Sequence, residues 1–489
     1  MNLGDIWRVM LKKIKKKWDS IPLEVKASTS YAVCNILQRC ISFITLPLFT
    51  RLLSKTQYGQ YTVYSSWSGI LMIFLTLNLA YGSFSTAMIK FEDARDQYIS
   101  SLEGIFLLLS SAFLIIYIPL RKIWNNFFEL PTFIVILMIF EIIAQSSILI
   151  WSGKKRFEYK YKSVIAITLS TSILGPVLAY LLVRNTTDKG YARILGYAAV
   201  TIIVGTIILI GNVRKGKSIF NKQYWKYAFG FNLPLLAYYL SQVIFNQSDR
   251  IMISKMNDTA HAAMYGVAYN LATLLTFVLN AINNSYVPWY YSKIKKGEQK
   301  DNRSVSSLIA ILMALLILCV IWFSPEIIYI LAGEGYYEAV YVVAPVAMSM
   351  LLLFYSQLFI NVEFYYEEKK SLVFASIGAA IANIVLNYIF IPIYGFVAAG
   401  YTTLVSYVIF AGANFIAMKK LLKKKNIEDI AYNYKLLIAI FIGFAVMSFI
   451  GVALYNVLWA RIAITFIIFV VTLINRKKFI ELIKKIKNK

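Results

Sequence analysis

The sequence predicts an all-α integral membrane protein of about 14 transmembrane helices, with two six-helix bundles around a central cavity and two further helices at the C-terminal end. Three observations predict this fold class. The 489 residues are 59% hydrophobic and only 15% charged, whereas soluble domains carry about 25% charged residues. The apolar residues come in runs of about twenty, which is the length that spans a bilayer. The two halves of the chain also repeat a short motif.

The apolar runs are separated by short polar loops, and no polar stretch is long enough to build a large globular domain. This pattern excludes a soluble enzyme and a membrane protein with a single anchor. The predicted spans cover residues 28–50, 61–88, 100–118, 130–150, 163–183, 191–211, 228–248, 261–290, 304–323, 338–362, 371–391, 395–417, 434–455 and 460–475.

The net charge of +26 follows the predicted topology. The even-numbered loops and both termini, which lie on one side of the membrane, contain 39 of the 50 Lys and Arg residues. The odd-numbered loops on the other side contain 10. The remaining residue, Arg39, lies inside a span. Because cytoplasmic loops are enriched in Lys and Arg, we expect both termini in the cytoplasm. The basic charge therefore reflects membrane orientation, and we expect no nucleic-acid partner.

Four parts follow from this arrangement. Residues 1–27 are expected to form an amphipathic helix on the cytoplasmic membrane surface, because apolar residues recur at helical spacing among lysines. Residues 28–227 and 228–417 are expected to form the first and second six-helix bundles. Residues 418–489 are expected to hold the two additional helices and a basic cytoplasmic tail.

The residues for common enzyme chemistry are missing from the sequence. The single histidine, His261, begins the eighth predicted span, and no P-loop or dinucleotide-binding glycine motif is present. We therefore predict no catalytic residue, no metal site and no cofactor, and the protein is not expected to be an enzyme. Polar groups inside many apolar spans are instead typical of a transporter, for which coupling to a proton or sodium gradient stays open.

Three predicted spans, the first, seventh and eighth, carry stripes of polar residues, and those of the first and seventh hold the candidate site residues. In the first span Tyr31, Asn35, Gln38, Ser42 and Thr45 recur every three or four residues. In the seventh span the residues Tyr238, Gln242, Asn246 and Asp249 do the same, and Arg250 follows. Polar groups that face lipid are costly, so each stripe is expected to face either a water-filled cavity or hydrogen-bonding partners on other helices.

Charged residues mark the candidate site most strongly. Arg39 lies near the middle of the first span, where an arginine costs about 2.5–3.5 kcal/mol on insertion scales. It is expected either to line a cavity or to form a structural ion pair, for example with Glu141. For Arg51 and Arg250, which lie at span ends, an interfacial role is the alternative. The candidate substrate-binding residues are Asn35, Gln38, Arg39, Arg51, Gln242, Asn246, Asp249 and Arg250.

A repeat relates the two halves at an offset of about 200 residues and six spans. Arg51 follows the first span and Tyr58-Gly59 opens the second, whereas Arg250 follows the seventh span and Tyr265-Gly266 lies in the eighth. An even number of spans gives both copies the same orientation. This is a parallel repeat, for which the binding site is expected between the halves.

These motifs resemble a known family. The segment LPLFTRLLSKTQYGQYTVY, which follows the polar first span, and FNLPLLAYYLSQVIFNQSDRIMISKM, which is followed by YGVAYN, are similar to the openings of the two halves of Wzx-type flippases. These proteins move bacterial polysaccharide or O-antigen repeat units. They belong to the multidrug/oligosaccharidyl-lipid/polysaccharide (MOP) exporter superfamily.

The resemblance implies an alternating-access flippase in the bacterial cytoplasmic membrane. Its substrate would be an oligosaccharide linked to undecaprenyl pyrophosphate, moved from the cytoplasmic to the outer leaflet. Arg39, Arg51 and Arg250 would match cavity arginines of the related lipid II flippases, whose two extra helices form a groove for the lipid tail. Expected partners are membrane lipids, a polysaccharide polymerase and glycosyltransferases. The alternatives are a multidrug or cation antiporter of the same fold and, from another class, a membrane glycan polymerase or ligase.

The topology can be tested by labelling single cysteines from either side of the membrane. A cysteine placed within 154–156 should react from the cytoplasmic side, and one placed within 333–335 should react from the outside, because the two loops differ in basic charge. Labelling of both positions from the same side would contradict the predicted orientation.

Overall fold

The computed structural model describes residues 21–368, 370–428 and 430–474, and all regular elements in this part of the chain are helices. Twelve of these helices are long and apolar enough to cross a membrane, which confirms the all-α membrane fold class. The amphipathic segment predicted for the N-terminus and the basic tail at the C-terminus fall largely on residues 1–20 and 475–489, outside the described residues.

The other two predicted spans coincide with helices that are not among these twelve. Residues 61–88 fall on α3 (Lys55–Thr76) and the short helix α4 (Phe84–Lys90). The chain leaves α3 because Leu77 and Asn78 adopt left-handed backbone angles, with φ of 48° and 54°. Residues 460–475 fall on α20 (Leu458–Ile474).

The described residues form two compact units. The first unit contains residues 21–53 and 67–236, and the second contains residues 54–66 and 237–474. Helix α3 is divided between them, because its residues 55–66 belong to the second unit and the rest to the first.

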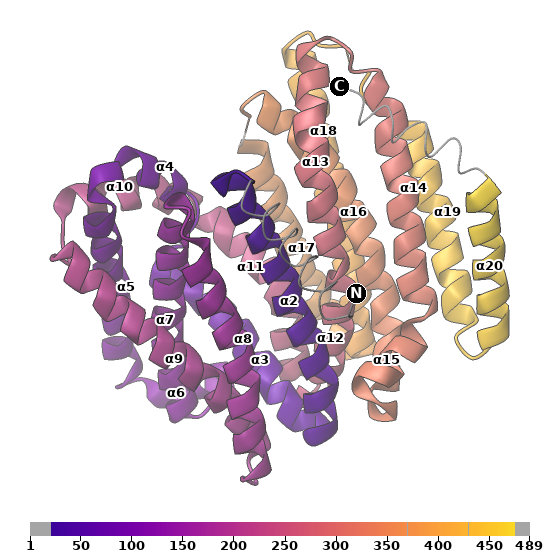
Figure 1. Ribbon diagram of the computed structural model, residues 1–489. Coiled ribbons are helices and arrows are strands. Elements are labelled where there is room, and N and C mark those ends of the chain that lie inside the picture. The colour runs from indigo at the N-terminus through magenta and orange to yellow at the C-terminus, as the bar shows by residue number, and fades with distance from the viewer. Residues whose placement is uncertain (1–20, 369, 429, 475–489) are drawn as a thin grey trace, which may run out of the picture. The chain divides into compact units, whose positions relative to one another are not determined.

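In the first unit α9 is the central helix, packed against α5, α7 and α8, while α2 packs against α8 (Figure 1). The short helices α4 and α10 close one end of the unit over a core that includes Tyr98, Phe106 and Tyr224. The helices of this unit, besides α3 and α4, are α2 (Leu23–Leu52), η1 (Glu92–Ala94), α5 (Arg95–Tyr117), α6 (Arg121–Phe128), α7 (Thr132–Phe157), α8 (Tyr161–Arg184), α9 (Lys189–Gly216), α10 (Lys222–Asn232) and η2 (Leu233–Leu235).

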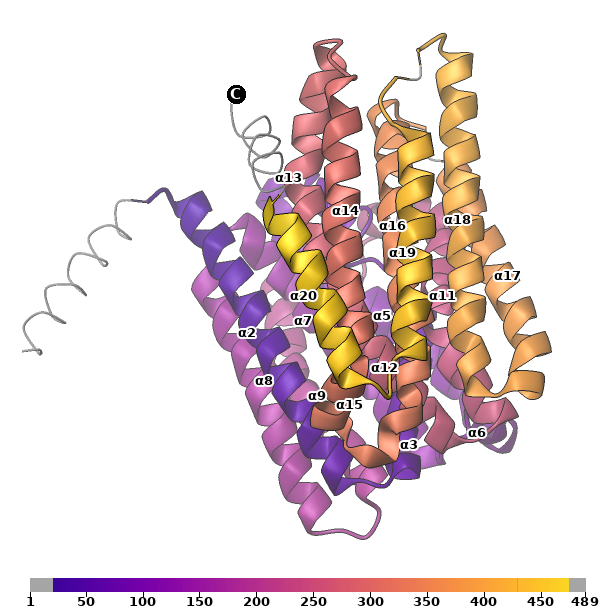
Figure 2. The ribbon, with the colours of Figure 1, turned by 90° about the vertical axis from the view of Figure 1, so that its right-hand side faces the viewer.

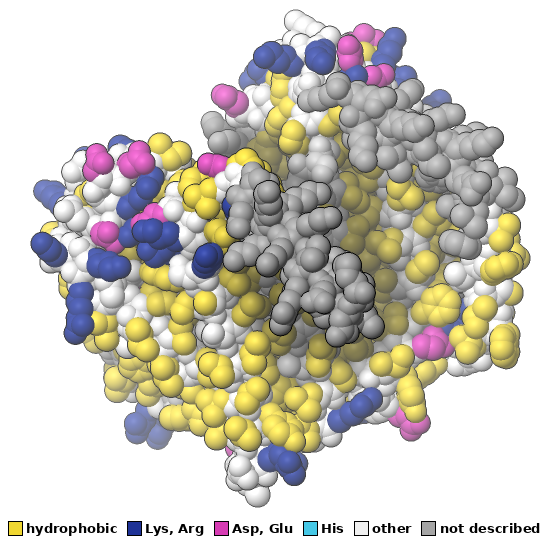
Figure 3. Space-filling view, viewed as in Figure 1, with side chains coloured by type: hydrophobic (Ala, Val, Ile, Leu, Met, Phe, Trp, Pro, Cys, Tyr) yellow, Lys and Arg dark blue, Asp and Glu magenta, His cyan; other side chains and the backbone are white. Residues whose placement is uncertain are grey.

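Charged side chains of the first unit gather at the end that carries α4 and α10, and hydrophobic side chains cover its flank on the face shown in Figure 3. At this end Lys154, Lys155 and Lys160 surround the carboxylate of Glu158 at 2.9–3.3 Å. Burial by itself raises the pKa of Glu158, but the hydrogen bonds from Lys160 and Lys155 and the charges of Lys154 and Lys155 hold it at about 2. The carboxylate therefore stays charged and holds the turn between α7 and α8.

In the second unit α16 is buried along most of its length and packs against α12, α14, α18 and α19. Helix α19 packs against α14, and α20 lies at the edge of the unit, in front of α14 in the view of Figure 2. The helices of this unit are α11 (Leu236–Met256), α12 (Thr259–Thr273), α13 (Leu275–Lys295), α14 (Asp301–Trp322), α15 (Ser324–Ala332), η3 (Glu334–Ala339), α16 (Val340–Tyr365), α17 (Lys370–Tyr394), α18 (Phe396–Lys424), α19 (Tyr434–Ala453) and α20.

Arg461 fixes α20 to the end of α14. Its side chain is 1% exposed and makes a bidentate pair with Glu326 at 2.7 and 2.8 Å. The same guanidinium donates to the backbone carbonyls of Trp322, Leu454 and Tyr455. An arginine can serve five acceptors in this way because it carries five N–H donors.

The repeated motif begins a helix in both halves. Ser54 and Gln57 cap α3 reciprocally, since each side chain accepts from the other residue's backbone N–H at 3.1–3.2 Å, which is a capping box. Asp258 caps α12, where its carboxylate accepts from the backbone N–H of His261 at 2.8 Å.

The two repeat glycines allow these helices to approach closely. A Cβ on Gly59 would lie 1.9 Å from the carbonyl oxygen of Thr259, and a Cβ on Gly266 would lie 2.9 Å from the side chain of Thr62. The start of α3 and the start of α12 therefore pack against each other through both copies of the motif. Small residues at such contacts are the usual means of close helix packing in membranes.

Replacing Gly59 by alanine should separate these two helices. Because the added Cβ would meet backbone rather than a flexible side chain, we expect Gly59→Ala to destabilise the protein by about 1–3 kcal/mol. The measurement is thermal unfolding of the detergent-solubilised protein. The matched control is Gly412→Ala on α18, where a Cβ would meet open space. Equal melting temperatures for Gly59→Ala and the unchanged protein would contradict this packing.

Candidate functional site

The polar stripe of the first predicted span lies on α2. Asn35 and Arg39 are exposed and Gln38 is partly exposed, whereas Cys34 on another face of the helix is buried. The hydroxyl of Ser42 bonds to the backbone carbonyl of Gln38 at 3.1 Å. The first unit therefore leaves Asn35 and Arg39 exposed on a helix that is otherwise largely apolar.

Two arginines lie near the ends of α2. Arg51 is exposed in the last turn of the helix. At the opposite end the guanidinium of Arg156, at the end of α7, lies 5.2 Å from the ring centre of Tyr31. All four sequence-predicted site residues of the first half thus belong to one helix of the first unit.

The other four candidate residues lie on α11, in the second unit, where they contact neighbouring helices. Gln242 donates to the hydroxyl of Ser376 on α17 at 2.8 Å. Asn246 accepts from the hydroxyl of Tyr269 on α12 at 2.9 Å and donates to the backbone carbonyl of Gln242. The stripe on α11 therefore joins three helices through side-chain hydrogen bonds.

Asp249 lies at the centre of the largest polar cluster on α11 and is 1% exposed. One carboxylate oxygen accepts from the hydroxyls of Tyr265 and of Thr403, the latter at 2.8 Å. The other oxygen accepts from the amide of Asn387 at 2.6 Å. These donors come from α12, α18 and α17, so the carboxylate joins four helices of the second unit.

A second layer of hydrogen bonds orients these donors. The Asn387 oxygen accepts from the hydroxyl of Thr402, and its amide also lies 3.2 Å from the side-chain oxygen of Asn383. Ser248 donates to the same oxygen of Asn383 at 3.2 Å. The cluster is therefore ordered through both Asn383 and Asn387, which are one turn apart on α17.

Arg250 is 8% exposed and points into a different group of side chains. Its guanidinium donates to Gln247 at 2.6 Å and lies 4.6 Å from the ring centre of Tyr269. Gln247 also accepts from Ser66 on α3 at 3.2 Å. Arg250 thus lies within the packed interior of the second unit, together with the first turns of α3.

The chemistry of the Asp249 cluster is that of a carboxylate held by neutral donors. Burying a charge without a paired countercharge is costly unless hydrogen bonds satisfy it. A carboxyl group in this setting can exist as an anion or be neutralised by a proton or a small cation, whose ligands would be carboxylate, amide and hydroxyl oxygens. Among the described residues, no group of three or more His, Cys, Asp or Glu side chains could hold a metal ion.

Sequence reasoning missed the partners of Asp249 on α17 and α18. Asn383 and Asn387 recur at helical spacing within an apolar segment, as do the polar residues of the two stripes. That spacing was the available signal. It could not identify the partner, because Asn387 and Thr403 are 138 and 154 residues away from Asp249.

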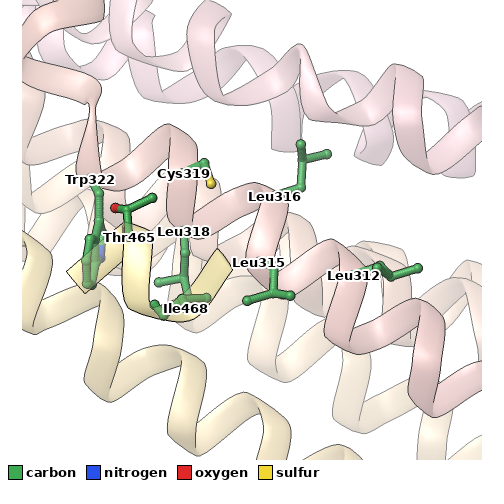
Figure 4. A pocket seen from close by; sticks show the side chains of 8 residues that line it. All are labelled: Leu312, Leu315, Leu316, Leu318, Cys319, Trp322, Thr465 and Ile468. Carbon is green, nitrogen blue, oxygen red and sulfur yellow. The ribbon is translucent and has the colours of Figure 1, made fainter. Parts of the chain in front are cut away.

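The second unit also contains an apolar groove between α14 and α20 (Figure 4). Its volume is about 290 Å³. In Figure 4, Leu318 of α14 lies beside Ile468 of α20 and Trp322 lies beside Thr465, whereas Leu316 points away from α20. The lining residues are Leu312, Leu315, Leu316, Leu318, Cys319, Trp322, Thr465 and Ile468.

Comparisons with known proteins cover most of the chain. The model of a family described as "Polysaccharide biosynthesis protein" matches residues 25–295. A Haemophilus influenzae protein named "Uncharacterized membrane protein" is 22% identical over 392 residues, which are 75% of this chain and 92% of the relative. This relative places the chain among multi-pass membrane proteins.

Two solved structures have a similar fold. The lipid II flippase MurJ in an inward closed conformation superposes with a TM-score of 0.66 and 15% identity, covering 92% of this chain and 99% of MurJ. A multidrug resistance MATE family transporter of the MOP superfamily, in an inward-facing conformation, has a TM-score of 0.58 and 13% identity. The match covers 81% of this chain and 98% of the MATE transporter. The chain therefore has the MOP-superfamily fold.

The hydrogen bond from Tyr265 to Asp249 should contribute to stability. A hydrogen bond to a charged group contributes about 1.5–3 kcal/mol, so Tyr265→Phe should lower the free energy of unfolding by that amount. Thermal unfolding in detergent measures it. The matched control is Tyr388→Phe on α17, because Tyr388 is 69% exposed. If both variants melt together with the unchanged protein, the Tyr265 hydroxyl does not hold the carboxylate.

Proposed function

The chain belongs to the polysaccharide biosynthesis protein family, and from that membership we propose that it is a flippase for lipid-linked oligosaccharides. Its substrate is an oligosaccharide on undecaprenyl pyrophosphate, which it moves from the cytoplasmic to the outer leaflet by alternating access. It acts in the bacterial cytoplasmic membrane, with both termini in the cytoplasm.

The observation that carries this proposal is the position of Arg39. It lies near the middle of a 30-residue membrane helix, and the first unit leaves its side chain exposed. A pyrophosphate must cross about 30 Å of hydrocarbon with several negative charges. An arginine binds phosphate oxygens through paired hydrogen bonds, so a guanidinium halfway across the membrane suits this head group.

Two further features support a lipid-linked sugar. Asn35 is one helical turn from Arg39 and shares its exposure, and an amide side chain both donates to and accepts from sugar hydroxyls. The apolar groove between α14 and α20 suits a hydrocarbon chain, which matches the tail-binding groove that the resemblance implies. The head group and the lipid tail would then be bound by different parts of the chain.

A cation-coupled antiporter of the same fold is the second candidate, and Asp249 favours it. The buried carboxylate is held by neutral donors and can be neutralised by a proton or sodium ion. The same chemistry also serves a flippase that uses an ion gradient, so Asp249 alone does not separate the two functions. Arg39 does, because a cationic substrate would be repelled by it.

Export of the cell's polysaccharide tests the role of Arg39. In a strain whose own copy of the gene is deleted, Arg39→Ala should reduce surface polysaccharide while the amount of protein in the membrane stays normal. Loss of charged hydrogen bonds worth about 1.5–3 kcal/mol corresponds to a roughly tenfold to hundredfold loss of substrate affinity. Arg39→Lys should retain part of the export, because it keeps the charge but not the paired geometry.

The matched control is Arg184→Ala, which removes an exposed arginine at the end of α8 and should leave export unchanged. Normal export by Arg39→Ala would refute the flippase site. Disappearance of Arg39→Ala from the membrane would instead assign Arg39 a structural role. Transport of a cationic drug by the unchanged protein, without polysaccharide export, would favour the antiporter.

A further inference from the structure

The first unit contains a buried carboxyl group that the proposed substrate site does not use. Glu103 lies in the third turn of α5, within a predicted membrane span, and is 0% exposed. Ser147 on α7 is 2.7 Å from one carboxyl oxygen, and Asn212 on α9 donates to the other at 2.8 Å. Ionisable groups inside the membrane are costly, which makes each of them a candidate for function.

Both hydrogen bonds of Glu103 come from neutral side chains. The nearest ion pair along these helices joins Asp96 of α5 to Lys154 of α7. Asp96 lies seven residues, or two helical turns, before Glu103, and Lys154 lies seven residues after Ser147. Among the described residues no charged side chain bonds to Glu103. Other charged groups on the packed helices include Glu141 on α7 and, on α9, the buried Arg193 and the exposed Arg214 and Lys215. Buried tyrosines on these helices include Tyr98 on α5 and Tyr224 on α10, which donates to Gln97.

Ser147 allows Glu103 to be either charged or neutral without an unsatisfied group. Its hydroxyl lies 2.7 Å from Glu103 and 3.0 Å from the backbone carbonyl of Ile143, but a hydroxyl has only one proton to donate. When Glu103 is ionised, Ser147 donates to it. When Glu103 is protonated, Ser147 donates to Ile143 and accepts the proton of the acid.

One face of α5 carries polar side chains between its exposed end and this carboxyl group. Asp96 is 45% exposed at its side chain, and Ser100 lies four residues after it and three before Glu103. The Ser100 hydroxyl is buried and has no hydrogen-bond partner among the described residues. It therefore has both its proton and its lone pairs available between the surface and Glu103.

We propose that Glu103 is a proton-binding site of the first unit, which exchanges its proton with water through Ser100 at the Asp96 end while Ser147 reverses its hydrogen bond. The ligand is a proton, which adds to a carboxylate oxygen of Glu103 and leaves a neutral acid in place of the anion. This inference is independent of the sugar substrate, because it concerns none of the α2 or α11 residues.

Infrared difference spectroscopy of the full chain in lipid vesicles tests the proposal. Between an acidic and an alkaline buffer the unchanged protein should show the absorption of a buried, protonated carboxyl group. Glu103→Gln should lose this band, whereas Asp249→Asn and Glu363→Gln, changes at the two other buried carboxyl groups of the described residues, should keep it. An unchanged spectrum in Glu103→Gln overturns the proposal, as does a band that responds to sodium at constant pH.

The hydroxyl switch has its own test, which holds even if Glu103→Gln fails to fold. Ser147→Ala should shift the frequency and the pH midpoint of the band, and Ser147→Thr, which keeps the hydroxyl, should restore both. A merely structural role of Ser147 would move neither. A band in Ser147→Ala identical to that of the unchanged protein contradicts the switch.

Hydrogen–deuterium exchange tests whether the proton of Glu103 reaches water through Ser100. In heavy water the carboxyl band shifts as deuterium replaces the proton, and Ser100→Ala should make this shift slower. The matched control is Ser110→Ala, another buried serine on α5 without a hydrogen-bond partner among the described residues, which lies seven residues beyond Glu103. Slowing in Ser110→Ala alone, or equal slowing in both variants, contradicts entry from the Asp96 end.

Discussion

Polar groups that this chain carries into the hydrocarbon must find their hydrogen bonds inside the protein, because lipid tails offer none. The backbone meets this constraint by forming helices throughout the spans. Many side chains meet it within their own helix: Ser146, Ser356 and Ser448 each donate to the backbone carbonyl four residues earlier. Such residues need no hydrogen-bond partner on another helix. The remaining polar residues need such a partner, and their hydrogen bonds join the helices around the candidate sites.

Two of the buried carboxyl groups, Asp249 and Glu103, show how the constraint joins distant segments. Asp249 is satisfied only when α12, α17 and α18 bring their donors to α11, and Glu103 only when α7 and α9 meet α5. Leaving such a group unsatisfied would cost more than a lost hydrogen bond. Each unit therefore has its own polar centre, and each centre is a carboxyl group held by neutral donors that can accept a change of charge.

Arg39 differs from these carboxyl groups in its exposure. The first unit leaves its side chain exposed on α2, although an arginine halfway across a membrane is costly. In the proposed flippase the anionic head group compensates for that charge during each passage, and the groove between α14 and α20 keeps the lipid tail in an apolar setting. Arg461, in contrast, is 1% exposed and donates to Glu326 and three backbone carbonyls, so the two arginines differ in their exposure.

The sequence by itself determined the membrane fold class, the repeat and the stripe on α2, because these depend on local spacing and composition. It also contained the cap formed by Ser54 and Gln57 and the repeat glycines Gly59 and Gly266, whose packing role became visible only in the helix contacts. Glu103 was overlooked because the apolar run begins near residue 100, which placed it at a predicted span boundary. The structure begins α5 at Arg95 and buries Glu103 completely. Only the tertiary structure decided which groups satisfy Glu103 and Asp249, since their partners are 16 to 154 residues away in the chain and lie on other helices, which no local pattern encodes.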